Sequence, residues 1–100
     1  MAATLPIYRN KEGKKLYPVC SWEENQHKLY NAYDRIMIHQ QDAFENGCSD
    51  KEWDEIEKSV ERIERALGAF DAHVIKGLVY ATWEDGQIIK DYVWAYNARH

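Results

Sequence analysis

Cysteine is scarce in this sequence, with Cys20 and Cys48 as its two thiols. If the segment between them is helical, the two cysteines lie roughly 35 to 40 Å apart, too far for a shared disulfide or metal ion. On the same helix His27 and His39 are about 18 Å apart, and His73 has no second ligand type at metal spacing beside it. We therefore expect reduced cysteines, no metal site and no cofactor.

Long apolar runs and catalytic motifs are also absent. No stretch approaches the ~18 apolar residues of a membrane span, and residues 1–15 lack the apolar core of a signal peptide. We therefore expect a cytoplasmic protein with no membrane contact. The sequence contains no Gly-x-Ser-x-Gly, no glycine-rich phosphate loop and no His-Glu-x-x-His, so we expect no enzymatic activity.

The chain has no surplus of positive charge. Its 13 basic and 17 acidic residues give a net charge of −4, which argues against a general nucleic-acid binder. With 45% hydrophobic and 30% charged residues, the composition is that of a single folded domain spanning residues 1–100. Aromatic residues are abundant instead: four Trp and seven Tyr, residue types that dominate cores and interfaces.

The segment 50–76 organises the rest of the chain. Its apolar residues recur at steps of three and four, which predicts a long helix with one apolar stripe. The stripe contains Trp53, Ile56, Val60, Ile63, Leu67, Phe70 and Val74. Gly68 weakens this helix by about 1 kcal/mol relative to alanine. Because Phe70 and Val74 keep the phase of the stripe, we expect the helix to continue to Lys76 and to stop at Gly77.

A second helix precedes this segment. Ser21 and Ser49 are each followed three residues later by a glutamate, which is the capping-box pattern of a helix start. The first helix is therefore expected over 22–46, with Gly47 as its C-terminal stop. The connection to the helix at 50 is so short that the two helices form an antiparallel hairpin.

The N-terminal residues 5–19 predict a β-hairpin. Two short β-type segments flank a polar turn in which Gly13 can adopt positive φ. Pro6 and Pro18 cannot donate to a ladder, so we expect both strands at a sheet edge.

The C-terminal part of the chain predicts a second hairpin. Segments 77–83 and 87–96 are rich in β-branched and aromatic residues, and Asp85-Gly86 between them is a strong hairpin signal. The predicted fold class is therefore α+β in the order ββααββ. The helical hairpin packs on an antiparallel sheet that the two terminal β-hairpins form.

Two surfaces are candidates for binding a protein partner. The C-terminal hairpin carries more aromatic surface than a short helical pair can cover, and Trp and Tyr are enriched at binding hot spots. The aromatic candidates are Trp83, Tyr92, Trp94 and Tyr96. A second, acidic set surrounds the connection between the helices: Asp42, Glu45, Asp50, Asp54, Glu55 and Glu57, together with Glu52. Burial in the core would explain the aromatics equally well, and favourable charge at a helix N-terminus explains Asp50 and Glu52.

The hypothesis from sequence is a small, non-enzymatic protein-interaction module. Small, aromatic-rich, mildly acidic domains without motifs are common among phage and mobile-element accessory proteins, including inhibitors that block a surface of a host protein complex. By this compositional analogy we expect an inhibitor. The identity of its partner stays open, and a homodimer through the stripe of 50–76 or an edge strand is a further possibility.

A nucleic-acid-binding accessory protein is the alternative hypothesis. Arg9, Lys11, Lys14 and Lys15 cluster on the first turn, near two tyrosines. Basic residues with neighbouring aromatics can hold a single strand. Lysines that protect an edge strand would account for the same residues, and four charges neutralise few phosphates.

Overall fold

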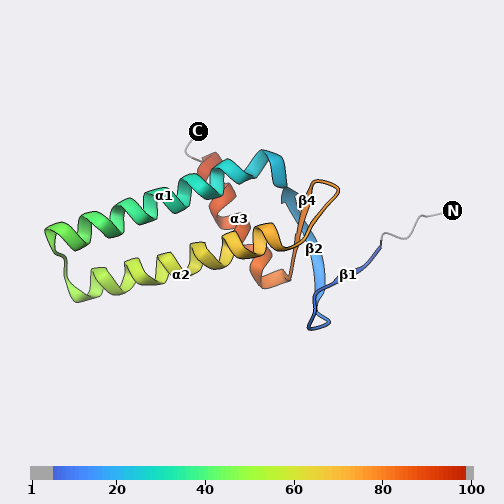
Figure 1. The fold of residues 1–100 in the computed structure, drawn as a ribbon, viewed down its shortest axis with the longest axis horizontal. Coiled ribbons are helices and arrows are strands. Elements are labelled where there is room, and N and C mark those ends of the chain that lie inside the picture. Colours follow the sequence, from blue (N-terminus) through green and yellow to red (C-terminus); the bar gives the residue numbers. More distant parts are fainter. Residues whose placement is uncertain (1–5, 99–100) are drawn as a thin grey trace.

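The computed structural model describes residues 6–98, with side chains up to residue 94. It confirms the α+β class, with an antiparallel helical hairpin joined to an antiparallel sheet, and adds a third helix (Figure 1). The elements in chain order are β1 (Tyr8–Arg9), β2 (Lys15–Ser21), α1 (Trp22–Asn46), α2 (Asp50–Ala72), β3 (Val74–Ile75), β4 (Leu78–Ala81) and α3 (Trp83–Ala98).

The helix starts and the helical hairpin follow the sequence prediction. The Ser21 hydroxyl accepts a hydrogen bond from the Glu24 amide at 3.4 Å, and the Ser49 hydroxyl accepts one from the Glu52 amide at 3.1 Å. Gly47 ends α1 with a φ of +81°, a conformation that favours glycine. These local signals fix where α1 and α2 begin and where the chain reverses.

Helix α2 ends earlier than the sequence predicts. It continues through Gly68 as expected but stops at Ala72, so the predicted extension to Lys76 is wrong. Val74 lies in β3, which pairs with β4 across a two-residue turn at Lys76 and Gly77, both with positive φ. A two-residue turn with positive φ matches the twist of paired strands. Val74 is β-branched and therefore suits a strand, where it gains a pairing partner in β4.

The sheet has the order β1-β2-β4-β3, and all its pairs are antiparallel. The predicted N-terminal hairpin is confirmed, with Tyr8 opposite Leu16. The prediction that Pro18 lies at a sheet edge is wrong, because β2 is an internal strand. The register shifts between Pro18 and Cys20, and such a bulge accommodates a residue without an amide donor.

The strand predicted within 77–83 is confirmed as β4, and a hairpin follows the helices as predicted, but its partner strand is β3. The strand predicted over 87–96 and the turn at Asp85-Gly86 are wrong, because residues 83–98 form helix α3. The Thr82 hydroxyl accepts a hydrogen bond from the Asp85 amide at 3.3 Å, which caps the helix start. Gly86 lies inside the first turns of α3 and faces Val19 of β2. A Cβ at position 86 would lie 3.3 Å from a Val19 methyl group, so this glycine permits close packing of α3 on the sheet.

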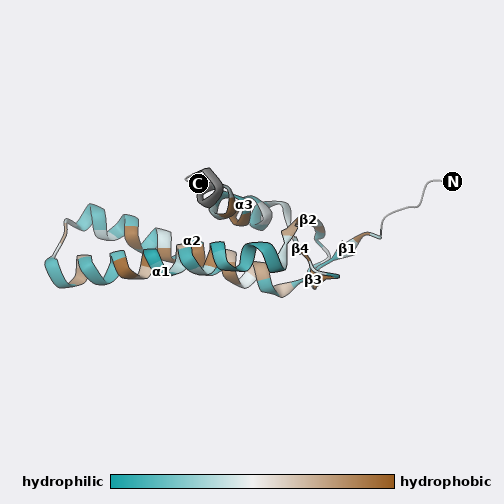
Figure 2. Cartoon of the chain, turned by 90° about the horizontal axis from the view of Figure 1, so that it is seen from above, coloured by the Kyte–Doolittle hydropathy of each residue, from teal (hydrophilic) through white to brown (hydrophobic). Residues whose placement is uncertain are grey.

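The core forms where the helical hairpin, the sheet and α3 meet. Helix α3 lies across α1 and α2 beside the sheet (Figure 1), on one face of the helical pair (Figure 2). The buried residues of this cluster are Leu29, Ile63, Ala66, Phe70, Val79, Ala81, Ile89 and Val93. Ion pairs of Arg62 with Asp91 and of Arg65 with Asp85 connect α2 to α3 at the edge of this core.

The helical hairpin projects beyond this core. The Cα radius of gyration is 16.1 Å, against about 13 Å expected for a compact chain of 100 residues, and the long dimension is 62 Å. We call residues 37–59, the end of the hairpin that extends past α3 in Figure 1, the distal arm. Ile56 is 5% exposed inside the arm, whereas Phe44 near its tip is 74% exposed. Within residues 6–98, no helix is both long enough and apolar enough to cross a membrane.

Phe70 and Phe44 provide a matched test of where the core lies. Phe70 is fully buried among the helices and β4, so Phe70→Ala should lower the free energy of unfolding by about 3 to 5 kcal/mol. Phe44→Ala should change it by no more than about 0.5 kcal/mol, because that ring is exposed. Urea denaturation followed by circular dichroism measures both. Equal losses for the two variants would contradict this core.

Candidate interaction surfaces

Two exposed tryptophans lie on one side of α3. Trp83 is 62% exposed and Trp94 is 73% exposed. They are eleven residues apart, which is about three helical turns, so they face the same direction roughly 16 Å apart. Gln87 and Lys90 fall between them at helical spacing. We call these four residues the α3 stripe.

The remaining aromatic candidates have different surroundings. Tyr92 is half-buried against the core, and the Arg62 guanidinium lies 5.5 Å from the centre of its ring. Tyr92 is therefore mainly a packing residue. Tyr96 belongs to α3, but its side chain lies outside the part of the chain that the structure describes. The aromatic surface predicted from sequence thus reduces to Trp83 and Trp94 among the described side chains.

The start of the α3 stripe meets the basic N-terminal turn. Trp83 and Tyr17 of β2 pack edge to face with ring centres 5.8 Å apart, and the Lys15 ammonium lies 5.0 Å from the Tyr17 ring centre. Beside them is an open cavity of about 320 Å³, which we call the basic hollow. It is lined by Arg9, Gly13, Lys14, Lys15, Tyr17, Thr82, Trp83 and Glu84. Lys11, the fourth basic candidate, does not line it.

The turn that carries the basic residues is held by its own hydrogen bonds. The Asn10 side-chain oxygen accepts from the amides of Glu12 and Lys14, each at 2.9 Å. The Arg9 guanidinium donates to the Gly13 carbonyl oxygen at 2.9 Å. The basic groups are therefore presented by an ordered turn rather than by a loose loop.

The acidic candidates gather on the distal arm. Residues 42–57 contain seven carboxylates and one lysine, a net charge of −6 where the whole chain carries −4. All six predicted acidic residues are exposed: Asp42, Glu45, Asp50, Asp54, Glu55 and Glu57. Some of them have local partners, since Lys58 pairs with Asp54 at 3.1 Å and the Trp53 indole donates to Glu57 at 2.6 Å. The acidic residues predicted from sequence, which we call the acidic tip, are therefore all exposed around the end of the arm.

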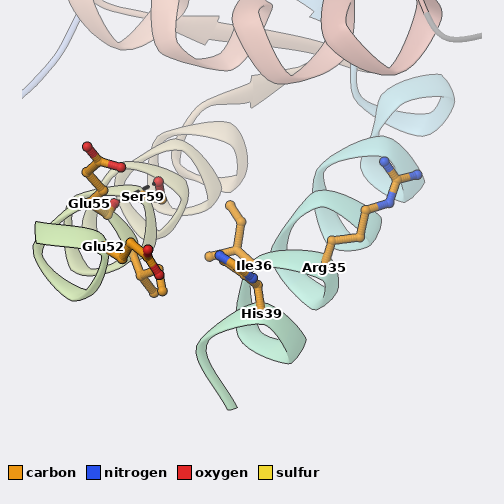
Figure 3. Close-up of a pocket in the computed structure, with 7 residues that line it drawn as sticks. Arg35, Ile36, His39, Glu52, Glu55 and Ser59 are labelled. Carbon is orange, nitrogen blue, oxygen red and sulfur yellow. Dashed lines mark hydrogen bonds between the residues drawn. The ribbon is translucent and has the colours of Figure 1, made fainter. Parts of the chain in front are cut away.

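A groove between α1 and α2 opens along this arm. Its volume is about 460 Å³, and it is lined by Arg35, Ile36, His39, Glu52, Glu55, Ile56 and Ser59. Figure 3 shows Ile36 and His39 projecting from α1 into the space between the helices, while Arg35 points away from α2. Glu52 and Glu55 are exposed to solvent on the side of this groove that α2 forms.

A second histidine borders a smaller cavity. His73 and Asp85 line a space of about 90 Å³ between α2, the sheet and the start of α3. This volume holds about three water molecules, less than a substrate needs. The Asp85 carboxylate accepts a hydrogen bond from the Arg65 guanidinium at 2.7 Å and is therefore paired with a cation.

The cysteines and histidines stay apart in the fold. Cys20 in β2 and Cys48 at the tip of the arm are both free thiols. Over residues 6–98, no group of three or more His, Cys, Asp or Glu side chains could hold a metal ion.

Comparison with protein-family models, with curated proteins and with solved structures finds no match to this chain.

The basic hollow combines two sets of residues that sequence reasoning kept apart. Trp83 was predicted on a partner-binding strand and the lysines on a separate turn. Tyr17 pairs with Ala81 in the sheet, which brings Trp83, two residues further on, beside the basic turn. The capping pattern from Thr82 to Asp85 was the available sequence signal for a helix starting at Trp83.

The two thiols provide a test of the burial described above. Burial raises the pKa of the Cys20 thiol, although Lys28 and Lys90 act in the opposite direction, whereas Cys48 is exposed. A raised pKa lowers the thiolate fraction near neutral pH, so iodoacetamide should modify Cys20 several-fold more slowly than Cys48. Peptide mass spectrometry at pH 7.5 measures both rates. In urea the difference should disappear, and equal rates in the native protein would contradict the burial of Cys20.

Proposed function

We propose that this protein is a non-enzymatic protein-interaction module that covers a surface of a partner protein. The observation that carries the proposal is the pair of exposed tryptophans, Trp83 and Trp94, on one stripe of α3. A folded domain of this size has a limited core, and two of its four tryptophans are exposed to solvent. Tryptophan is the residue type most enriched at interface hot spots.

The composition of the stripe fits a protein interface. Gln87 and Lys90 between the tryptophans supply polar groups, as in the rim of an interface around apolar anchors. The acidic residues of α3 lie elsewhere on the helix, where Asp85 and Asp91 pair with the arginines of α2. The stripe therefore presents aromatic anchors without unpaired carboxylates among its members.

The distal arm serves as a second contact. Its net charge of −5 attracts a basic surface, and complementary charge accelerates association more than it strengthens the final complex. The arm extends past α3 along the 62 Å length of the molecule, so it can reach a part of the partner that α3 does not touch. Contact at both places would cover a large surface of the partner. A small protein inhibits its partner when it covers such a surface.

The first experiment is to identify the partner by site-specific photo-crosslinking. A photoreactive amino acid at position 87, between the two tryptophans, should crosslink one protein in the native host. The same amino acid at Lys76, on the turn between β3 and β4, is the control and should not crosslink that protein. Equal capture from both positions would mark the crosslink as nonspecific.

The affinity of that partner then tests the stripe. Trp94→Ala should lower the affinity at least about ten-fold, because truncating a hot-spot tryptophan costs about 2 kcal/mol or more. The fold should be retained, since this ring is 73% exposed. Isothermal titration calorimetry gives the affinities, and circular dichroism confirms folding. Ile7→Ala, at a residue that is 62% exposed and distant from the stripe in the chain, is the control and should bind like the wild type.

Two outcomes would contradict the proposal. If Trp94→Ala binds the crosslinked partner with unchanged affinity, the stripe is not the interface. If Trp94→Ala unfolds the protein, the ring belongs to the packed structure and its exposure is misassigned.

A further inference from the structure

The basic hollow, which shares Trp83 with the α3 stripe, has the composition of a site for an anionic, aromatic ligand. Three of its lining residues are cationic, namely Arg9, Lys14 and Lys15, and two are aromatic, namely Tyr17 and Trp83. Its volume of about 320 Å³ lies at the lower end of the range for small-ligand sites. The hollow is thus large enough for one aromatic base with its phosphate.

We propose that the basic hollow binds single-stranded nucleic acid, with a base stacked on Trp83 and the neighbouring phosphates on Arg9, Lys14 and Lys15. Trp83 is 62% exposed even though it contacts Tyr17, so part of its ring is open to a ligand. Stacking on an aromatic ring tolerates any base, and a cationic rim follows the backbone. Duplex bases are stacked on each other, so the hollow selects a single strand.

The charges around the hollow support an anionic ligand. The segment 9–15 carries four basic residues and one acidic residue. Glu12 of this segment lies 3.9 Å from the Lys14 ammonium, and Glu84 at the edge of the hollow lies 3.6 Å from the Arg65 guanidinium. The lining of the hollow therefore holds three cations and one carboxylate, Glu84, which has its own partner in Arg65, so the lining keeps a positive surplus. An acidic peptide shares the charge of a nucleic acid but not its bases, so the ring of Trp83 favours the strand.

The test uses the full chain and a fluorescently labelled 12-nucleotide oligothymidine, with binding measured by fluorescence anisotropy between 25 and 200 mM salt. With three phosphate contacts, the logarithm of the affinity should fall with the logarithm of the salt concentration at a slope of about −2. A 12-base-pair duplex should bind more weakly than the single strand. Equal affinities for the duplex and the single strand, or no binding of the single strand at 25 mM salt, would overturn the proposal.

Variants of the two tryptophans test whether stacking on Trp83 contributes to binding. Trp83→Ala should lower the affinity for oligothymidine roughly ten-fold, because loss of one base–aromatic stack has about that effect. Trp94→Ala, on the same helix and more exposed, should bind oligothymidine like the wild type. Trp83→Phe keeps an aromatic ring and should retain most of the affinity, which separates lost stacking from a disturbed fold. Equal losses for Trp83→Ala and Trp94→Ala would overturn the assignment of Trp83.

Variants of four lysines test the contribution of positive charge at the hollow. The double variant Lys14→Ala/Lys15→Ala should reduce the slope with salt from about −2 to about −0.7, since one of three phosphate contacts remains. The double variant Lys51→Ala/Lys58→Ala removes the same charge from the distal arm and should leave the slope unchanged. Equal effects of the two pairs would mean that net charge alone governs binding. If polyglutamate displaces the strand from the wild type as effectively as unlabelled oligothymidine does, the hollow recognises charge alone and the proposal is overturned. Because Trp94 is needed for the proposed protein partner and not for this site, the two proposals fail separately.

Discussion

Burial of the apolar stripes of α1 and α2 is the constraint on which the rest of this structure depends. Leu29 and Phe70 are fully buried where the two helices meet, and each such side chain contributes roughly 1.5 to 3 kcal/mol. Two helices alone leave one side of their shared apolar surface exposed. Helix α3 covers that side with Ile89 and Val93, and β4 closes the end with Val79. Because α3 completes the core, the packing of the core also fixes the positions of the exposed tryptophans and of the basic hollow.

The sequence predicts the helical hairpin well because its signals are local. Ser21 and Ser49 cap their helices through the hydrogen bonds that the capping-box pattern implies. Thr82 caps α3 in the same way, but Asp85-Gly86 suggested a hairpin turn and masked this signal. The apolar residues that follow also repeat at helical spacing: Ile88, Ile89, Tyr92 and Val93. Tertiary packing outweighs the local preference for a turn, because Gly86 allows α3 to approach the sheet at Val19.

The candidate sites were less predictable, because their geometry depends on registers that the sequence does not reveal. Trp83 and Trp94 face the same direction because they lie three helical turns apart, a relation that does not hold if the segment is a strand. The approach of Trp83 to Tyr17 depends on the pairing of β2 with β4, which shifts at the bulge after Pro18. The acidic tip was predictable, since seven carboxylates lie within sixteen residues around one helix connection.

The elongated shape also changes what the net charge of −4 means. The acidic tip and the basic turn stand at opposite ends of α1 and α2, whose 23 to 25 residues span roughly 35 Å. The Debye length at physiological ionic strength is about 8 Å, so some four screening lengths separate the two charged ends. An approaching polyanion near the N-terminal turn therefore experiences the local positive potential and almost none of the distal negative one. The two ends of the molecule therefore act as separate charged surfaces, and the isoelectric point of the whole chain describes neither surface.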